Sequence, residues 1–426
     1  MAASMMPNDR PSAKVSVLLP TFNRARYVGA AINSLLSQIH KPFEIIILDD
    51  GSTDETAAIC SSFGDRVNYV RITDNGGKSA AINLGIGLAR GDFIWIMDDD
   101  DFVLPVALSL LLAPLLADDS LGFSFGALRK FSMSEDGRIH FAEADARPPG
   151  PSSLFVHLME DCFITGQPCT LFRRSCLESL APFDTSVLSS VDYNILLQVA
   201  RVHRGIDVGK VVLWQRQHSG DRGPVAMRYA ATTRVERWRE FDQRLIARLM
   251  DQMELHEYLG FAELSEPLTP RQQRSALVQK AVIAGRKELW TVAIDTLREA
   301  VGVDPGRPFE PRDLETLARI LGSRYGIEAL LRELAVQTGL ADAATGGLNS
   351  QEVRIAIASL LTFWTREAIR KGDASGGLGC IRAMMRIAGL RGTLILLARV
   401  VTRRVGVVGL ARSAAGALGG PDYAPE

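Results

Sequence analysis

Apolar and polar residues alternate in two different ways along the chain. Over residues 14–117, short apolar runs of strand length are separated by segments in which apolar residues recur with helical period. The apolar runs cover residues 15–19, 43–48, 67–72 and 93–97. Strands that alternate with helices in this way predict an α/β fold, with a mostly parallel sheet and helices on both faces.

The pattern changes after Pro224. Alanine, leucine and arginine dominate there, and helical period replaces the strand pattern over residues 225–258, 271–301 and 311–336. We therefore expect a disordered lead over residues 1–13, an α/β domain over 14–222 and an all-helical domain over 223–426.

Polar side chains follow three of the predicted strands. Pro20-Thr21-Phe22-Asn23 follows the first strand, Asp49-Asp50 the second, and Asp98-Asp99-Asp100-Asp101 the fourth. The carboxyl ends of parallel strands meet at one edge of a sheet, so we expect these three groups to lie close together. Ser52 and Glu55 have the spacing of a capping box, which predicts a helix from Thr53.

Four adjacent aspartates need a positive charge nearby, unless they form a solvated acidic loop. Two like charges about 4 Å apart repel by roughly 4 kcal/mol at an effective dielectric constant near 20. Mg²⁺ and Mn²⁺ bind carboxylate oxygens and substrate phosphates. Beside side chains that can hydrogen-bond a base and a ribose, such a cation predicts a nucleoside-diphosphate substrate.

Composition narrows the class of protein. Hydrophobic residues make up 47% of the chain and charged residues 23%, as in a globular protein, and the net charge of -1 gives no reason to expect nucleic acid as a partner. The five cysteines form no C-x-x-C pair, which favours reduced thiols in the cytoplasm. The sequence has no run of about eighteen uncharged apolar residues, so we expect no membrane-spanning helix.

Residues 14–221 resemble a family 2 glycosyltransferase with the GT-A fold. The resemblance rests on the joint order of the motifs PTFN, DDGSTD, a strand-borne DxD and WQRQH. It implies a mixed, mostly parallel sheet flanked by helices.

The resemblance also implies a role for each matching residue. The nucleotide-sugar contacts would come from Pro20, Thr21, Asn23, Asp49, Asp50, Lys78, Asp98 and Asp99. Lys78 stands in for an arginine that the family often has before Asn83, where this chain has Ile82.

A divalent cation, Mn²⁺ or Mg²⁺, would bind at the DxD motif. Asp100 is the expected direct ligand and Asp98 the other member of the motif, while Asp99 and Asp101 would support it through the ribose or the donor sugar. His218 matches a metal- or diphosphate-facing position, although a lone histidine at a strand end is equally often structural.

Asp192 matches the family's catalytic base, but Val191 replaces the glutamate that usually precedes it. The implied reaction is inverting transfer of a sugar from a nucleoside diphosphate, with UDP as the preferred carrier. A glycan or another hydroxyl compound would accept the sugar, in polysaccharide or other glycoconjugate synthesis.

Two alternatives remain open. A sugar-1-phosphate nucleotidyltransferase would need a glycine-rich loop directly after the first strand, where this chain has Pro20-Thr21-Phe22-Asn23-Arg24. A non-catalytic sugar-nucleotide-binding or scaffold protein would fit the departures at Val191 and Ile82.

The last helical segment, residues 381–418, is apolar and basic. A solvated bundle helix, self-association and peripheral contact with the inner face of a membrane are all consistent with this pattern.

Overall fold

The computed structural model describes residues 13–134, 138–142, 153–187, 189–217, 234–260 and 267–402. They fall into two compact units. The first unit is drawn from residues 1–145 and 164–234, and the second from 146–163 and 235–426. The described residues 153–163 therefore group with the helices, although they lie between two stretches of the first unit in the sequence.

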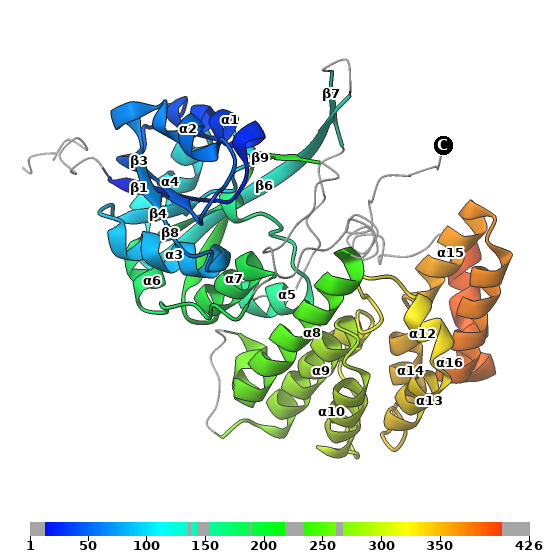
Figure 1. The fold of residues 1–426 in the computed structure, drawn as a ribbon. Coiled ribbons are helices and arrows are strands. Elements are labelled where there is room, and N and C mark those ends of the chain that lie inside the picture. Colours follow the sequence, from blue (N-terminus) through cyan, green and yellow to red (C-terminus); the bar gives the residue numbers. More distant parts are fainter. Residues whose placement is uncertain are drawn as a thin grey trace, which may run out of the picture. The chain divides into compact units, whose positions relative to one another are not determined.

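The first unit is built on one twisted sheet (Figure 1). Its strands are β1 (Val15–Thr21), β2 (Glu44–Asp49), β3 (Asn68–Arg71), β4 (Phe93–Ile96), β5 (Phe102–Val103), β6 (Leu121–Met133), β7 (Ile139–Phe141), β8 (Thr170–Arg173) and β9 (Arg204–Arg216). The order is β3-β2-β1-β4-β8-β6-β9-β5, with β7 paired to β6. The sheet is mixed, as predicted.

Strands β3, β2, β1 and β4 pair in parallel with one another, and β6 and β9 form a second parallel pair elsewhere in the sheet. Strand β1 pairs with β2 up to the register Thr21 opposite Asp49, and with β4 on its other side. All residues of β2 and β4 are buried, which explains their continuous apolar runs. The carboxyl ends of β1, β2 and β4 therefore meet at one edge, as the sequence predicted.

Helices lie on both faces of this sheet (Figure 1). They are α1 (Ala25–Leu36), α2 (Thr56–Ser61), α3 (Gly77–Leu88), α4 (Ala107–Ala117), α6 (Arg174–Glu178) and α7 (Val191–Val202). Helix α3 approaches the sheet closely at Gly85, where a Cβ atom would come within 2.6 Å of the Leu48 side chain. A glycine at this position lets α3 pack directly on β1 and β2.

The predicted capping box at Ser52 and Glu55 is wrong. Helix α2 begins at Thr56, and its N-cap residue makes no side-chain hydrogen bond to the helix. The Ser52 hydroxyl instead accepts a hydrogen bond from the backbone N–H of Asn23, at 2.8 Å. The Ser52 hydroxyl, which a capping box would need, is thus hydrogen-bonded to the loop between β1 and α1.

The second unit is all-helical among its described residues. It contains α5 (Leu154–Glu160), α8 (Arg234–Gln252), α9 (Pro270–Arg286), α10 (Trp290–Gly302), α11 (Pro311–Leu317), α12 (Glu328–Arg332), α13 (Leu334–Ala343), α14 (Ser350–Ala358), α15 (Leu361–Lys371), α16 (Ala374–Thr402) and the 3-10 turn Leu255–Leu259. Leu297, Leu340, Ile357 and Ile387 are fully buried in its core. No described helix is long and apolar enough to cross a membrane.

Glu160, at the end of α5, forms a buried ion-pair network inside this unit. Its carboxylate accepts hydrogen bonds from Arg319 at 2.8 and 2.9 Å and from Gln279 at 2.7 Å. Arg286 donates to the Glu160 carbonyl and pairs with Asp161. The pKa of Glu160 is lowered, since Arg319 and Arg286 outweigh the effect of burial. These contacts hold α5 among the helices.

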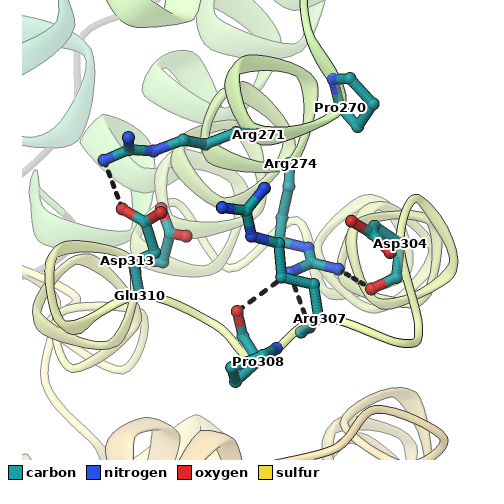
Figure 2. A pocket seen from close by; sticks show the side chains of 8 residues that line it. All are labelled: Pro270, Arg271, Arg274, Asp304, Arg307, Pro308, Glu310 and Asp313. Atoms are coloured by element: carbon teal, nitrogen blue, oxygen red, sulfur yellow. Dashed lines mark hydrogen bonds and ion pairs between the residues drawn. The ribbon is translucent and has the colours of Figure 1, made fainter.

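A small pocket between α9 and the turn before α11 is organised by Arg274 (Figure 2). Its guanidinium donates to the carbonyl oxygens of Asp304, Arg307 and Pro308. Nearby, Arg271 pairs with Glu310. Arg274 is thus a structural brace for the turn.

We expect Glu160→Ala to lower the free energy of unfolding of the helical unit by about 3–5 kcal/mol, because the Arg319 guanidinium would stay largely buried without its carboxylate partner. Urea denaturation followed by circular dichroism measures this change. Asp295→Ala is the matched control, because Asp295 forms an exposed pair with Arg298 and its loss should cost less than about 1 kcal/mol. Equal losses in the two variants would contradict a stabilising role for the buried network.

Candidate functional site

Lys78, in the first turn of α3, joins two acidic side chains that are far apart in sequence. Its ammonium lies 2.7 Å from an Asp98 carboxylate oxygen and 2.6 Å from an Asp192 oxygen. Asp98 follows β4, whereas Asp192 lies in the first turn of α7. The three side chains are between 23% and 32% exposed, so the cluster opens to solvent while staying partly desolvated.

The charges of this cluster shift the pKa values of its members. Burial alone would lower the pKa of Lys78, but the attraction of Asp192 and Asp98 raises it. Burial raises the pKa of Asp98, and repulsion from Asp192 and Asp100 adds to the effect while Lys78 opposes it. The single ammonium of Lys78 therefore balances the negative charge of these carboxylates only in part.

The remaining aspartates after β4 have different surroundings. Asp99 lies 3.4 Å from the Arg24 guanidinium, and burial together with Asp100 raises its pKa to about 7. Asp101 is buried and accepts a hydrogen bond at 2.8 Å from the backbone N–H of Arg216, at the end of β9. Asp101 thus has a structural contact that the sequence pattern alone did not indicate.

Asp49 and Asp50 both fix loops at the sheet edge. Asp49 accepts hydrogen bonds from the Ser52 backbone and the Tyr69 hydroxyl. The two oxygens of Asp50 accept from the backbone N–H groups of Gly76 and Gly77, at 2.9 and 2.8 Å. Burial raises the pKa of Asp50, although these two donors oppose the shift. Asp50 therefore sets the position at which α3, and with it Lys78, begins.

Asn23 fixes the neighbouring loop. Its backbone has a positive φ of 53°, which asparagine tolerates better than most residues. Its side-chain oxygen accepts hydrogen bonds from the backbone N–H groups of Thr53 and Asp54. Pro20 and Thr21 are the last residues of β1, one residue short of Asn23, and Thr21 is buried. The loops after β1 and β2 are thus bound to each other.

Asn83 positions the loop that leads towards Asp192. Its amide accepts from the Phe183 N–H and donates to the Phe183 carbonyl, both at 2.8 Å. The neighbouring Ile82 is fully buried in the core, and Val191 is buried at the start of α7. Hydrophobic packing therefore occupies both positions at which the sequence departs from the family pattern.

The sequence of the first unit is similar to known glycosyltransferases. Residues 16–181 match the family model described as glycosyl transferase family 2. An uncharacterized glycosyltransferase of Rickettsia typhi is 27% identical over 223 residues, which are 52% of this chain and 70% of that protein. Glycosyltransferase GlyG of Streptococcus pneumoniae is 39% identical over 95 residues, 22% of this chain and 32% of GlyG.

Most of residues 16–181 lie in the first unit, which we therefore call the family 2 unit. Among solved structures, this chain is similar to S. aureus TarS residues 1–349 in complex with UDP-GlcNAc, with a TM-score of 0.45 and 18% identity over 87% of this chain and 91% of TarS 1–349. The family match ends at residue 181, before Asp192.

The family 2 unit brings together Lys78, Asp98 and Asp192 as one ionic cluster, and the roles predicted for them stay predictions. His218 lies outside the described residues. Sequence reasoning missed Arg24, Tyr69 and Arg216, which contact the predicted aspartates. Of these three residues, only Arg24 could have been found from the sequence, because it directly follows the PTFN motif.

We expect Asn83→Ala to lower the free energy of unfolding of the family 2 unit by about 1–3 kcal/mol, because both backbone groups of Phe183 lose their partner. Urea denaturation measures the loss. Asn68→Ala, at an exposed position of the edge strand β3, is the control and should change stability by less than about 0.5 kcal/mol. Indistinguishable stabilities would show that Asn83 does not hold the loop.

Proposed function

We propose that this chain is an inverting, metal-dependent glycosyltransferase that moves a sugar from a nucleoside diphosphate, UDP by preference, to an acceptor hydroxyl. The family match supports glycosyl transfer. The observation that carries the finer proposal is the shared contact of Asp98 and Asp192 with Lys78. It supports a single site in which a strand-borne carboxylate and a second carboxylate face the same small volume.

Asp192 is the proposed general base. Its carboxylate accepts the proton of the acceptor hydroxyl while the hydroxyl oxygen bonds to the anomeric carbon. The bond from that carbon to the diphosphate oxygen breaks on the opposite face, and the electron pair leaves with the nucleoside diphosphate. A single displacement needs this one base and no carboxylate nucleophile, and it inverts the anomeric centre.

Asp98 and Asp100 are the proposed ligands of Mg²⁺ or Mn²⁺. Their oxygens are of the hard type that these ions prefer, and Mg²⁺ is typically held by one or two carboxylates together with substrate phosphates. Among the residues that the structure describes, no group of three or more His, Cys, Asp or Glu side chains could hold a metal. The proposed ion would therefore take its further ligands from the donor phosphates, and would neutralise the leaving diphosphate.

We expect Asp192→Asn to reduce sugar transfer by about 10²- to 10⁴-fold, because the amide cannot accept the proton. Transfer is measured with a panel of UDP-, GDP- and dTDP-sugars and Mn²⁺, and donor binding by thermal shift, which ligand binding raises by mass action. The thermal shift with the donor should persist in the variant.

Asp207→Asn, on an exposed turn within β9, is the control and should keep full activity. Near-normal transfer by Asp192→Asn would remove Asp192 from the base role. Binding of nucleotide sugars without transfer in the unaltered chain would favour the non-catalytic alternative. A chain that binds no sugar nucleotide would contradict the proposal as a whole.

We expect Lys78→Met to bind Mn²⁺ about tenfold more tightly in the absence of nucleotide, because the ammonium and the ion would compete for Asp98. Isothermal titration with Mn²⁺ alone measures this affinity, and no transfer activity is needed. Lys210→Met, at an exposed position in β9, is the control. Equal Mn²⁺ affinities in all three proteins would place the ion away from the Lys78 contact.

A further inference from the structure

The last part of α16 presents an apolar surface to solvent. Leu390, Leu394 and Ile395 are 64%, 60% and 38% exposed, whereas Thr393 and Leu396 on the other side of the helix are buried. The chain turns at Gly389, whose φ of 68° lies outside the helical region, so this part of α16 takes its own direction. We call the surface formed by Leu390, Arg391, Leu394, Ile395 and Arg399 the outer face of α16.

The charge of this segment has one sign. Between residues 374 and 421 the sequence has seven arginines and no lysine, aspartate or glutamate. Arg391 and Arg399 are exposed on the outer face beside the aliphatic side chains. Glu367, on the neighbouring helix α15, is paired with Arg370. Helix α14 also packs against α16, and its Glu352 accepts a hydrogen bond from Asn349, so the acidic side chains of α14 and α15 have other partners.

We propose that the outer face of α16 binds the surface of a membrane that contains anionic lipids. Aliphatic side chains flanked by arginines match the boundary between acyl chains and negatively charged headgroups. Arginine stems can cover apolar surface while the guanidinium groups reach phosphate.

Self-association is a poorer fit to the same surface. A symmetric dimer would place the outer face against its own copy, and would therefore bring arginines together without an acidic partner. Anionic headgroups supply the missing negative charge, and each arginine near such a surface strengthens binding by about fivefold.

Co-sedimentation of the full chain with vesicles tests the proposal. One vesicle preparation contains phosphatidylcholine alone, and the other has about a third of it replaced by phosphatidylglycerol. We expect binding to the anionic vesicles only, and weaker binding as salt is added, because surface charges are screened.

Two double variants separate the apolar contribution from the charge. Leu390→Ser with Leu394→Ser, and Arg391→Gln with Arg399→Gln, should each weaken binding by about tenfold or more. Leu334→Ser with Leu348→Ser is the matched control, since both leucines are exposed elsewhere in the helical unit, and it should bind like the unaltered chain. Thermal melts establish that every variant is folded.

The proposal is overturned if the folded chain does not bind anionic vesicles, or if both double variants bind as well as the unaltered chain. It is also overturned if sedimentation velocity shows a lipid-independent dimer that Leu390→Ser with Leu394→Ser dissociates. None of these outcomes depends on glycosyl transfer, so the membrane proposal and the proposed enzyme activity fail or stand separately.

Discussion

The family 2 unit depends on how it holds like charges together at one edge of its sheet. Asp98 and Asp192 would repel each other in a partly desolvated site, and the Lys78 ammonium between them offsets that repulsion. This ion pair constrains the position of α3, which must begin where the Lys78 ammonium can reach both carboxylates. Asp50 meets this requirement through the N–H groups of Gly76 and Gly77, so an aspartate after β2 determines the geometry of an ion pair after β4.

The same edge shows why a motif residue need not contact a ligand directly. Asn23 and Asp49 share the loop after β2, since Asn23 accepts from Thr53 while Asp49 accepts from Ser52. Their hydrogen bonds fix the position of the loop after β2 relative to the end of β1. A nucleoside bound there would meet a surface shaped by these side chains, whatever contacts they make with it themselves.

Much of the fold could be predicted from the sequence because strand and helix periods are local. The strands β1, β2 and β4 appear as uninterrupted apolar runs, and the meeting of their ends follows from parallel pairing. The capping box at Ser52 failed because Asn23, far away in sequence, uses the same hydroxyl. Likewise, the contacts of Arg216 with Asp101 and of Asn83 with Phe183 depend on tertiary packing that no spacing encodes.

The net charge of -1 conceals a separation of charge along the chain. Acidic residues concentrate at 98–101, where burial and mutual repulsion raise the pKa values of Asp98 and Asp99. Arginines alone carry the charge over residues 374–421. Because the Debye length is about 8 Å at physiological salt, an anionic ligand near α16 responds to the local arginines and not to the total charge. A near-neutral protein can therefore concentrate negative charge at one place and positive charge at another.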